Sequence, residues 1–289
     1  MRIVDKFKSK KPTLSLEFFP PKEEDKFPRF WENVEQLSKA DPDFVSITCG
    51  AGGSGQGNTM PTARGLKQDY GLEVMVHQTC VNSSKKELEK FLQEISETGI
   101  ENVLALRGDE PNDPAVRKSK GDFEYASELV KFLKSKNPAL CVAAAAYPGA
   151  HPESASIKED LYWLKHKVDQ GVDLLHTQFF FDNRQYFDFV ERLRDMGIEC
   201  PVIPGVLPIF SFNSLKYILS VSGTMIPGSL YLKIEKILQD EGPDGVLKFG
   251  IDFASEQIND LLEKGAPGIH LYTLNRAQPS LNIINSCPF

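Results

Sequence analysis

The sequence predicts a (β/α)8 barrel, and three observations support this fold class. The 289-residue chain contains eight short apolar runs, most of them followed by a segment with helical periodicity. These runs are nearly continuous in apolar character, which is typical of parallel strands covered on both faces. The length is also close to the roughly 250 residues of such a barrel. Because no change in composition marks a boundary, we predict one domain over residues 1–289.

The predicted strands and helices alternate along the chain. The strands are residues 13–19, 44–49, 73–80, 102–108, 140–147, 174–181, 202–209 and 268–274, and the helices are 83–98, 153–170 and 245–264, with an extra helix within 223–244. In the first helix, Ser84 and Glu87 have the spacing of a capping box, and Gly99 suits the helix end. A doubly wound sheet fits less well, because it usually has about six parallel strands and a separate substrate domain.

The composition excludes several classes of protein. A net charge of −7 without a basic block argues against binding to nucleic acid or to anionic membranes. No apolar run approaches the roughly 20 residues of a membrane span, and the N-terminal stretch lacks the apolar segment of a signal peptide. The five cysteines form no C-x-x-C pair. They indicate reduced thiols, a cytoplasmic location and no structural zinc site.

Polar side chains gather where the predicted strands end. The active site of a (β/α)8 barrel lies at the carboxyl ends of its strands, so this grouping indicates an enzyme. The residues are Glu17, Thr48, His77, Gln78, Thr79, Arg107, Gly108, Asp109, Tyr147, His151, Gln178 and 272–276. Loop polarity explains part of the pattern. Glu17, His77 and Gln178, however, lie inside apolar runs, where a polar group needs a partner.

Glu17 is the main candidate for catalysis. Its neighbours are leucines and phenylalanines, and burial among them would favour the protonated carboxyl, which can donate a proton. The structural alternative is a buried Glu17 paired with Arg or Lys. The chain has no H-E-x-x-H, no cluster of His and Cys and no G-x-S-x-G. We therefore predict neither a metal site nor a serine nucleophile.

Residues 50–55 fit the G-x-G-x-x-G pattern of a Rossmann dinucleotide site, and Glu73 follows at about the 20-residue spacing of that motif. Two features count against this interpretation. We predict no apolar helix directly after the glycines, and Glu73 opens the next strand instead of closing it. We expect ligand contacts from Thr48 to Ala51, and a mobile loop at 52–55.

The chain resembles the methylenetetrahydrofolate reductase family. The matching segments span nearly the whole chain in the family's order: LSLEFFPPK (14–22), FVSIT (44–48), ALRGDEP (105–111), AAYPGAHPES (145–154), TQFFFD (177–182), PVIPGVLPI (201–209) and HLYTLNR (270–276). The resemblance implies a barrel that binds FAD without a Rossmann loop and reduces 5,10-methylenetetrahydrofolate to 5-methyltetrahydrofolate. It also implies a ping-pong cycle, a homo-oligomer, a role in one-carbon metabolism and methionine supply, and no regulatory domain of the animal type.

The resemblance also implies a role for individual residues. Glu17 matches the acid that protonates N10 of the folate, and Asp109 matches the carboxylate near the flavin and the pterin. Gln178 matches the residue that meets pterin and nicotinamide. Ser214, Ile218 and Arg276 lie where the family holds the folate. FAD contacts are implied for Thr48, Ala51, His77, Arg107, Gly108, Asp109, Ala126, Tyr147, His151, Ser154, Asp160, His166 and Lys167.

Several alternatives stay open at the level of sequence. The electron donor could be NADH, NADPH or a partner protein linked to ferredoxin. The chain could also be a barrel flavoprotein or pterin enzyme with another substrate, because fold alone permits it. A Rossmann dehydrogenase and a non-catalytic folate- or flavin-binding subunit are the remaining alternatives. The presence of both Glu17 and Asp109 argues against the non-catalytic subunit.

Overall fold

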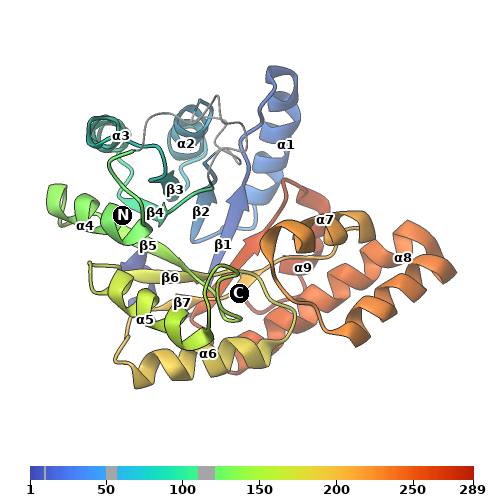
Figure 1. Ribbon diagram of the computed structural model, residues 1–289. Helices are drawn as coiled ribbons and strands as arrows, with labels where there is room; N and C mark the ends of the chain where they lie inside the picture. The colour runs from blue at the N-terminus through green and yellow to red at the C-terminus, as the bar shows by residue number, and fades with distance from the viewer. Residues whose placement is uncertain (10, 50–56, 110–120) are drawn as a thin grey trace.

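The computed structural model describes residues 1–9, 11–49, 57–109 and 121–289 (Figure 1). The strands are β1 (Thr13–Phe18), β2 (Phe44–Ile47), β3 (Val74–Thr79), β4 (Asn102–Leu106), β5 (Cys141–Ala146), β6 (Leu174–Thr177), β7 (Val202–Ile203), β8 (Gly205–Val206) and β9 (Gly268–Tyr272). The helices are α1 (Phe27–Ser38), α2 (Thr59–Gln68), α3 (Lys85–Thr98), α4 (Ala126–Lys136), α5 (Ile157–Val168), α6 (Asn183–Asp195), α7 (Phe212–Ser222), α8 (Gly228–Glu263) and α9 (Ala277–Ile284), with short 3-10 helices at Ile3–Lys8 and Glu24–Lys26.

The sheet closes on itself through one interrupted strand. Its order is β7-β6-β5-β4-β3-β2-β1-β9-β8, and every paired neighbour is parallel. Only Pro204 separates β7 from β8 in the chain, and proline has no N–H to donate to a ladder. The Pro204 carbonyl still accepts a 3.0 Å hydrogen bond from the His270 backbone N–H. Residues 202–206 therefore occupy one of eight strand positions, which confirms the predicted (β/α)8 barrel and rules out an open Rossmann sheet.

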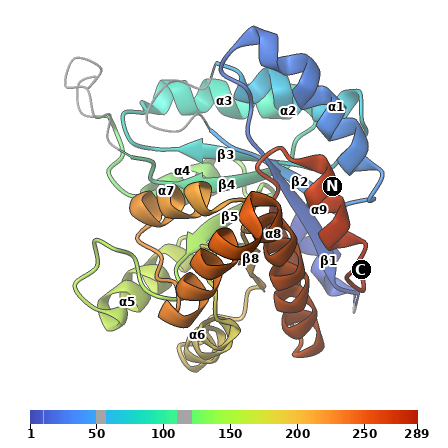
Figure 2. The ribbon, with the colours of Figure 1, turned by 90° about the vertical axis from the view of Figure 1, so that its right-hand side faces the viewer.

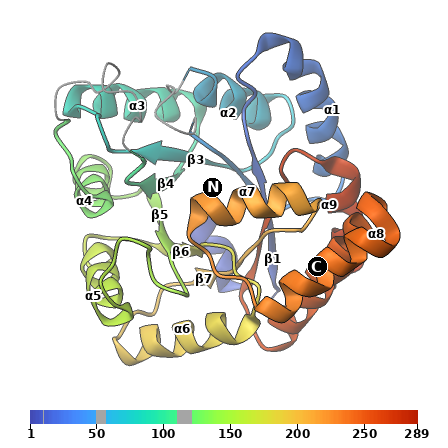
Figure 3. The same ribbon diagram turned by 45° about the vertical axis from the view of Figure 1, so that its right-hand side comes forward.

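The two faces of each strand have different roles. On β1, Leu14, Leu16 and Phe18 belong to the apolar layer between the strands and the surrounding helices. Because side chains alternate along a strand, Ser15 and Glu17 point to the barrel interior. Figure 3 shows the helices around the strands, with α1 to α3 above, α4 and α5 at the left, α6 below and α8 and α9 at the right.

The base of the barrel is apolar, and the N-terminal segment closes it. Ile3 is fully buried there against an interior cluster that includes Phe44, Met75 and Leu174. The Ile3 backbone N–H donates to Asn102 Oδ1 at 2.7 Å. Within the described residues, the N-terminal segment thus covers the base of the barrel, at the end opposite to that where the strands finish.

Helix α7 and the N-terminal part of helix α8 form a layer at the end where the strands finish (Figure 2). The Phe212 and Tyr231 rings join the two helices with centroids 5.2 Å apart. Helix α8 consists of two helical segments that meet at Gly242, where φ is 74° and the helical pattern breaks. The first segment is the predicted extra helix, and the second is the predicted long one.

Most predicted elements are present, with shifted ends. Helix α3 has the predicted capping box of Ser84 and Glu87, and Gly99 takes the left-handed conformation at its end. Strand β6 is shorter than predicted, because Phe179 and Phe181 continue the apolar run but pack against α7 and α8. Helix α5 begins at residue 157 and not at 153.

Helix α2 corrects one prediction, because it begins at Thr59, a few residues after the glycines. Its apolar face consists of Met60, Ala63 and Leu66. Pro61 and Gly65, two poor helix formers, obscure this pattern in the sequence. The predicted loop at 52–55 lies outside the described residues.

Candidate active site

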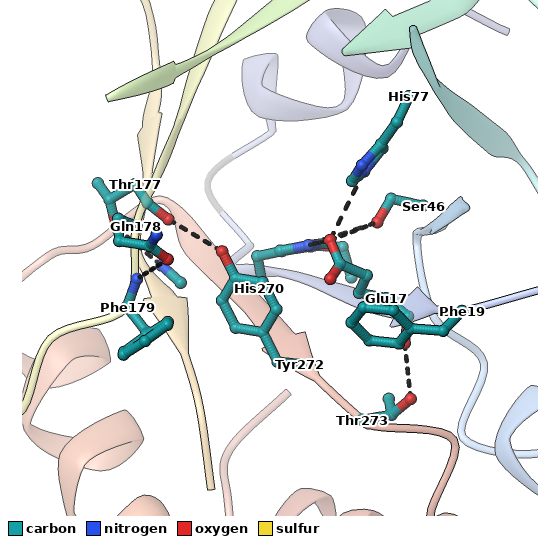
Figure 4. Close-up of polar contacts among 12 residues, drawn as sticks. Glu17, Phe19, Ser46, His77, Thr177, Gln178, Phe179, His270, Tyr272 and Thr273 are labelled. Carbon is teal, nitrogen blue, oxygen red and sulfur yellow. Dashed lines mark hydrogen bonds and ion pairs between the residues drawn. The ribbon is translucent and has the colours of Figure 1, made fainter. Parts of the chain in front are cut away.

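Glu17 lies buried at the top of the barrel interior, where three polar side chains from three other strands surround its carboxyl group (Figure 4). Ser46 Oγ donates to Glu17 Oε2 at 3.4 Å. His270 Nε2 lies 3.4 Å and His77 Nε2 lies 3.5 Å from the same oxygen. Among the described residues no Arg or Lys pairs with Glu17, so they offer no partner for the structural alternative of a buried ion pair with a strong base.

The His270 ring is held by Ser15, the inward neighbour of Glu17 on β1. The Ser15 hydroxyl donates to the Ile269 carbonyl at 3.0 Å and lies 2.9 Å from His270 Nδ1. A hydroxyl has a single hydrogen. His270 Nδ1 must therefore donate to Ser15 Oγ, which leaves Nε2 facing Glu17. One proton can then lie between Glu17 Oε2 and His270 Nε2, on either atom.

His77 faces Glu17 as a neutral ring. Burial lowers the pKa of His77 to about 4, although the Glu17 carboxylate acts in the opposite direction. The 3.5 Å contact is therefore not an ion pair at neutral pH. His77 Nε2 is buried and lacks a hydrogen-bond partner within the described ranges. It is thus available to a ligand atom in the barrel mouth.

The polar layer continues with His176 on β6. The centroids of the His176 and His270 rings lie 4.5 Å apart, and the two rings meet edge to face. Burial and the neighbouring histidines lower the pKa of His176 well below its usual range. His176 and His77 are therefore both neutral and add no positive charge beside Glu17.

A second group of predicted residues lies along β5 and the loop that follows it. Tyr147, His151, Ser154 and Gln178 line one cavity of about 310 Å³. The Tyr147 and His151 rings meet with centroids 4.7 Å apart. Ser154 Oγ donates to Asp160 Oδ1 at 2.9 Å. The structure therefore brings together five residues predicted to bind FAD or substrate.

Lys167 is a half-buried cation beside this group. Its Nζ donates to the Ala145 carbonyl at 2.7 Å, and no carboxylate lies within ion-pair distance among the described residues. Burial lowers the pKa of Lys167 to about 8, with Asp160 opposing the shift. A half-buried ammonium without a carboxylate partner among the described residues is suited to binding an anionic group such as a diphosphate.

The end of β4 contributes Arg107, Gly108 and Asp109. Arg107 Nη1 donates to Glu153 Oε2 at 2.8 Å, while Arg107 Nε is buried without a partner in the part of the chain that is described. Gly108 has φ of 81°, and a Cβ there would lie 2.9 Å from Thr79 Cβ. Burial raises the pKa of Tyr147, and the negative charge of Asp109 raises it further. The Asp109 carboxylate therefore lies close to the cavity that Tyr147 lines.

The residues predicted to hold folate lie around the same end of the barrel. Gln178 directly follows β6, and its Oε1 accepts from the Phe179 N–H at 3.1 Å. Ser214 and Ile218 lie on α7, which covers this end. The Arg276 guanidinium lies over the Phe210 ring at 4.9 Å.

The remaining predicted contacts are more dispersed. Thr48 directly follows β2, Ala126 begins α4, and His166 is exposed on α5, where its ring meets that of Trp163. Ala51 lies outside the described residues.

Sequence reasoning missed Ser15, Ser46, His176 and His270, which complete the polar interior. Each lies two residues before a residue at a strand end that was noticed: Glu17, Thr48, Gln178 or Tyr272. Strand alternation places each such pair on the same inward face, so this spacing was the available signal.

Two features are absent from the described residues. They contain no group of three or more His, Cys, Asp or Glu side chains placed to hold a metal ion. None of the helices in the described ranges is long and apolar enough to cross a membrane.

Fold and site together define a (β/α)8-barrel enzyme with a buried carboxyl–imidazole pair beside a ligand cavity. Residues 2–288 match the family described as methylenetetrahydrofolate reductase. The chain therefore belongs to the methylenetetrahydrofolate reductase family of enzymes, as the resemblance predicted.

Individual relatives agree with this assignment. The chain is 34% identical to 5,10-methylenetetrahydrofolate reductase of Escherichia coli, covering 94% of this chain and 90% of that protein. It is also 36% identical to methylenetetrahydrofolate reductase (NADH) 1 of Arabidopsis thaliana, covering 98% of this chain. The chain spans 50% of the plant protein.

Solved structures resemble the fold at low sequence identity. An uncharacterized protein from Clostridium thermocellum, described as binding two copies of 5-methyl-5,6,7,8-tetrahydrofolic acid, has a TM-score of 0.68 at 16% identity, covering 98% of this chain and 97% of that one. A dihydropteroate synthase from Xanthomonas albilineans has a TM-score of 0.52 at 13% identity, covering 96% and 92%. These similarities concern the barrel alone.

Proposed function

We propose that this protein reduces 5,10-methylenetetrahydrofolate to 5-methyltetrahydrofolate through FAD, with Glu17 as the general acid. The observation that carries the proposal is the buried Glu17–His270 pair at the mouth of a barrel from this family. A carboxyl group in such a position can deliver a proton where water cannot. Methylenetetrahydrofolate needs one, because its five-membered ring opens when N10 is protonated.

Glu17 and His270 act as one proton donor in this mechanism. When Glu17 gives its proton to N10, the carboxylate is left beside His270 Nε2 and the Ser46 hydroxyl, 3.4 Å from each. Both groups can stabilise the new charge by hydrogen bonding. His77 stays neutral and contributes no positive charge. Asp109, at the mouth, would favour cationic character in the opened folate.

The residues around the cavity fit FAD. Lys167 offers a half-buried ammonium for the diphosphate, and Arg107 Nε lacks a partner among the described residues. Gly108 has a left-handed backbone and packs against Thr79. Because it has no side chain, the cofactor can approach its backbone closely. When bound, FAD would supply the hydride for the one-carbon unit. Its remaining contacts are those implied by the resemblance, including Tyr147, His151 and Asp160.

Other properties belong to the same proposal. NADH or NADPH is the proposed electron donor, and the NADH in the plant relative's name supports the first. We propose a cytoplasmic homo-oligomer, and the five free cysteines fit that location. One catalytic domain over residues 1–289 and a role in methionine supply also stay predictions.

The spectrum of the purified protein tests the proposal directly. We expect a yellow protein with the absorbance of oxidised flavin. Anaerobic NADH or NADPH should bleach this band, and methylenetetrahydrofolate should restore it while 5-methyltetrahydrofolate forms. A protein that cannot be loaded with FAD would overturn the proposal. So would a reduced protein that reacts only with other acceptors.

A further inference from the structure

Side chains of the turn after β9 form hydrogen bonds to the end of β1, the strand that carries Glu17. Asn275 Oδ1 accepts from the Phe19 backbone N–H at 3.0 Å, and Asn275 Nδ2 donates to the Phe19 carbonyl at 2.7 Å. The Asn275 side-chain amide thus makes the two hydrogen bonds to the Phe19 backbone that a neighbouring strand would otherwise make. Thr273 Oγ1 also donates to the Glu17 carbonyl at 2.6 Å, a contact drawn in Figure 4.

These contacts begin where the main-chain ladder ends. The pairing of β1 with β9 stops at Glu17 and Tyr272. On the opposite side, the Thr48 N–H donates to the Phe18 carbonyl at 3.0 Å. Glu17, Phe18 and Phe19 therefore each have a backbone group fixed beyond the β1–β9 ladder. This fixation limits the freedom of the Glu17 side chain to leave His270.

The turn itself has an unusual backbone. Leu274 and Asn275 are consecutive non-glycine residues with φ of 49° and 55°. Asparagine tolerates this conformation well, whereas leucine rarely adopts it. The Asn275 N–H donates to Thr273 Oγ1 at 3.1 Å, which ties the turn together. Backbone strain that persists in a fold tends to occur at functional sites.

We propose that Asn275 is a positioning residue for the proton-transfer step. Its amide holds the end of β1 so that Glu17 stays beside His270. The same turn also places Arg276 over Phe210 at the barrel mouth. Asn275 thereby fixes the proton donor relative to a predicted folate contact. This inference rests on the proposed function, in which Glu17 protonates the folate.

The test measures the two half-reactions separately by stopped flow. Asn275→Gly removes both contacts to Phe19 and accepts the left-handed backbone without strain. We expect flavin reduction by NADH at the wild-type rate, and folate reduction slower by roughly 100-fold, the effect of a small misplacement of a catalytic group. The rate of folate reduction by Asn275→Asp should lie between those of the wild-type protein and Asn275→Gly. A carboxylate accepts from the Phe19 N–H but cannot donate to the Phe19 carbonyl.

Asn58→Ala is the matched control. Asn58 Nδ2 donates to the Pro21 carbonyl at 2.7 Å, so this variant removes the same kind of bond from the same segment, farther from Glu17. It should leave both half-reactions unchanged. Wild-type folate reduction in Asn275→Gly, or equal slowing of both half-reactions, would overturn the inference.

A crystal structure of Asn275→Gly separates this inference from the proposed function. The distance between Glu17 Oε2 and His270 Nε2 should exceed 3.4 Å in the variant. An unchanged distance rejects the positioning role even if the wild-type protein does not reduce the folate. Failure of the wild-type protein to reduce the folate would reject the proposed function alone.

Discussion

Ser15 Oγ lies 2.9 Å from His270 Nδ1, and this contact decides which ring nitrogen faces Glu17. The serine lies two residues before Glu17, on the same inward face of β1. One strand therefore carries both the acid and the group that orients its imidazole partner. Proton transfer at Glu17 should depend on Ser15, although Ser15 does not contact Glu17 itself.

Replacement of Ser15 by alanine tests this dependence. Ser15→Ala removes the acceptor for His270 Nδ1, so the ring loses its fixed orientation. A neutral hydrogen bond is worth about 1 kcal/mol, which corresponds to roughly a fivefold slower folate half-reaction. Flavin reduction should not change. Ser280→Ala is the control, since Ser280 is also fully buried but its Oγ has no partner within the described ranges.

Glu17→Gln should slow one half-reaction and spare the other. The amide keeps the size of the side chain but cannot act as an acid. We expect folate reduction to slow by about 10²- to 10⁴-fold, the usual contribution of a general acid, while NADH still reduces the flavin. Stopped-flow absorbance of the flavin measures both steps. Equal slowing of the two would remove Glu17 from its assigned role.

Burial of neutral His77 should make the fold less stable in mild acid. The pKa of His77 is about 4 in the fold and 6.5 in the unfolded chain, so the unfolded chain binds more protons between these values. Stability therefore falls as the pH decreases through this window. From pH 7 to pH 5 the loss is roughly 2 kcal/mol. His77→Gln should reduce this loss of stability, as measured by urea unfolding curves at pH 7 and pH 5.

Two other histidines help to interpret this test, one as a second source of acid sensitivity and one as a control. The pKa of His176 is also lowered by burial, so His77→Gln should retain part of the acid sensitivity. His166→Gln replaces an exposed histidine and should follow the wild-type curve. If His77→Gln and the wild-type protein lose stability in parallel between pH 7 and pH 5, the buried neutral ring is not the cause.

The barrel and its acid were predictable from the sequence because their signals are local. Eight apolar runs revealed the strands, and Glu17 stood out as a charge inside one of them. His270 and Ser15 were not predicted because they lie inside their strands and not at the strand ends. Their importance comes from long-range closure, which brings residue 270 beside residue 15 through the pairing of β9 with β1.

Local patterns also misled the prediction where tertiary packing decides the outcome. Residues 179–181 look like a continuation of β6, yet the chain leaves the strand there, and Phe179 and Phe181 pack against α7 and α8. Helix α2 was not predicted because Pro61 and Gly65 lie within it, but burial of Leu66 and its neighbours outweighs their low helix propensity. In both cases, contacts distant in sequence override a local preference.

Lys167 should make FAD binding weaker above about pH 8. In the cofactor-free protein the pKa of Lys167 is about 8, so the side chain becomes neutral as the pH rises through this value. A bound diphosphate would raise that pKa, and binding must then take up a proton. The FAD dissociation constant should be flat below pH 8 and rise up to about tenfold per pH unit above it. Quenching of FAD fluorescence measures it.

Substitutions of Lys167 separate charge from packing. Lys167→Met should weaken FAD binding by roughly 10- to 100-fold at pH 7, because it removes a charge-assisted hydrogen bond, and it should abolish the slope above pH 8. Lys167→Arg stays charged throughout and should also lack the slope. Lys165→Met is the control on the same helix, because Lys165 pairs with Asp169. A slope that survives in Lys167→Met would assign the pH dependence to another group.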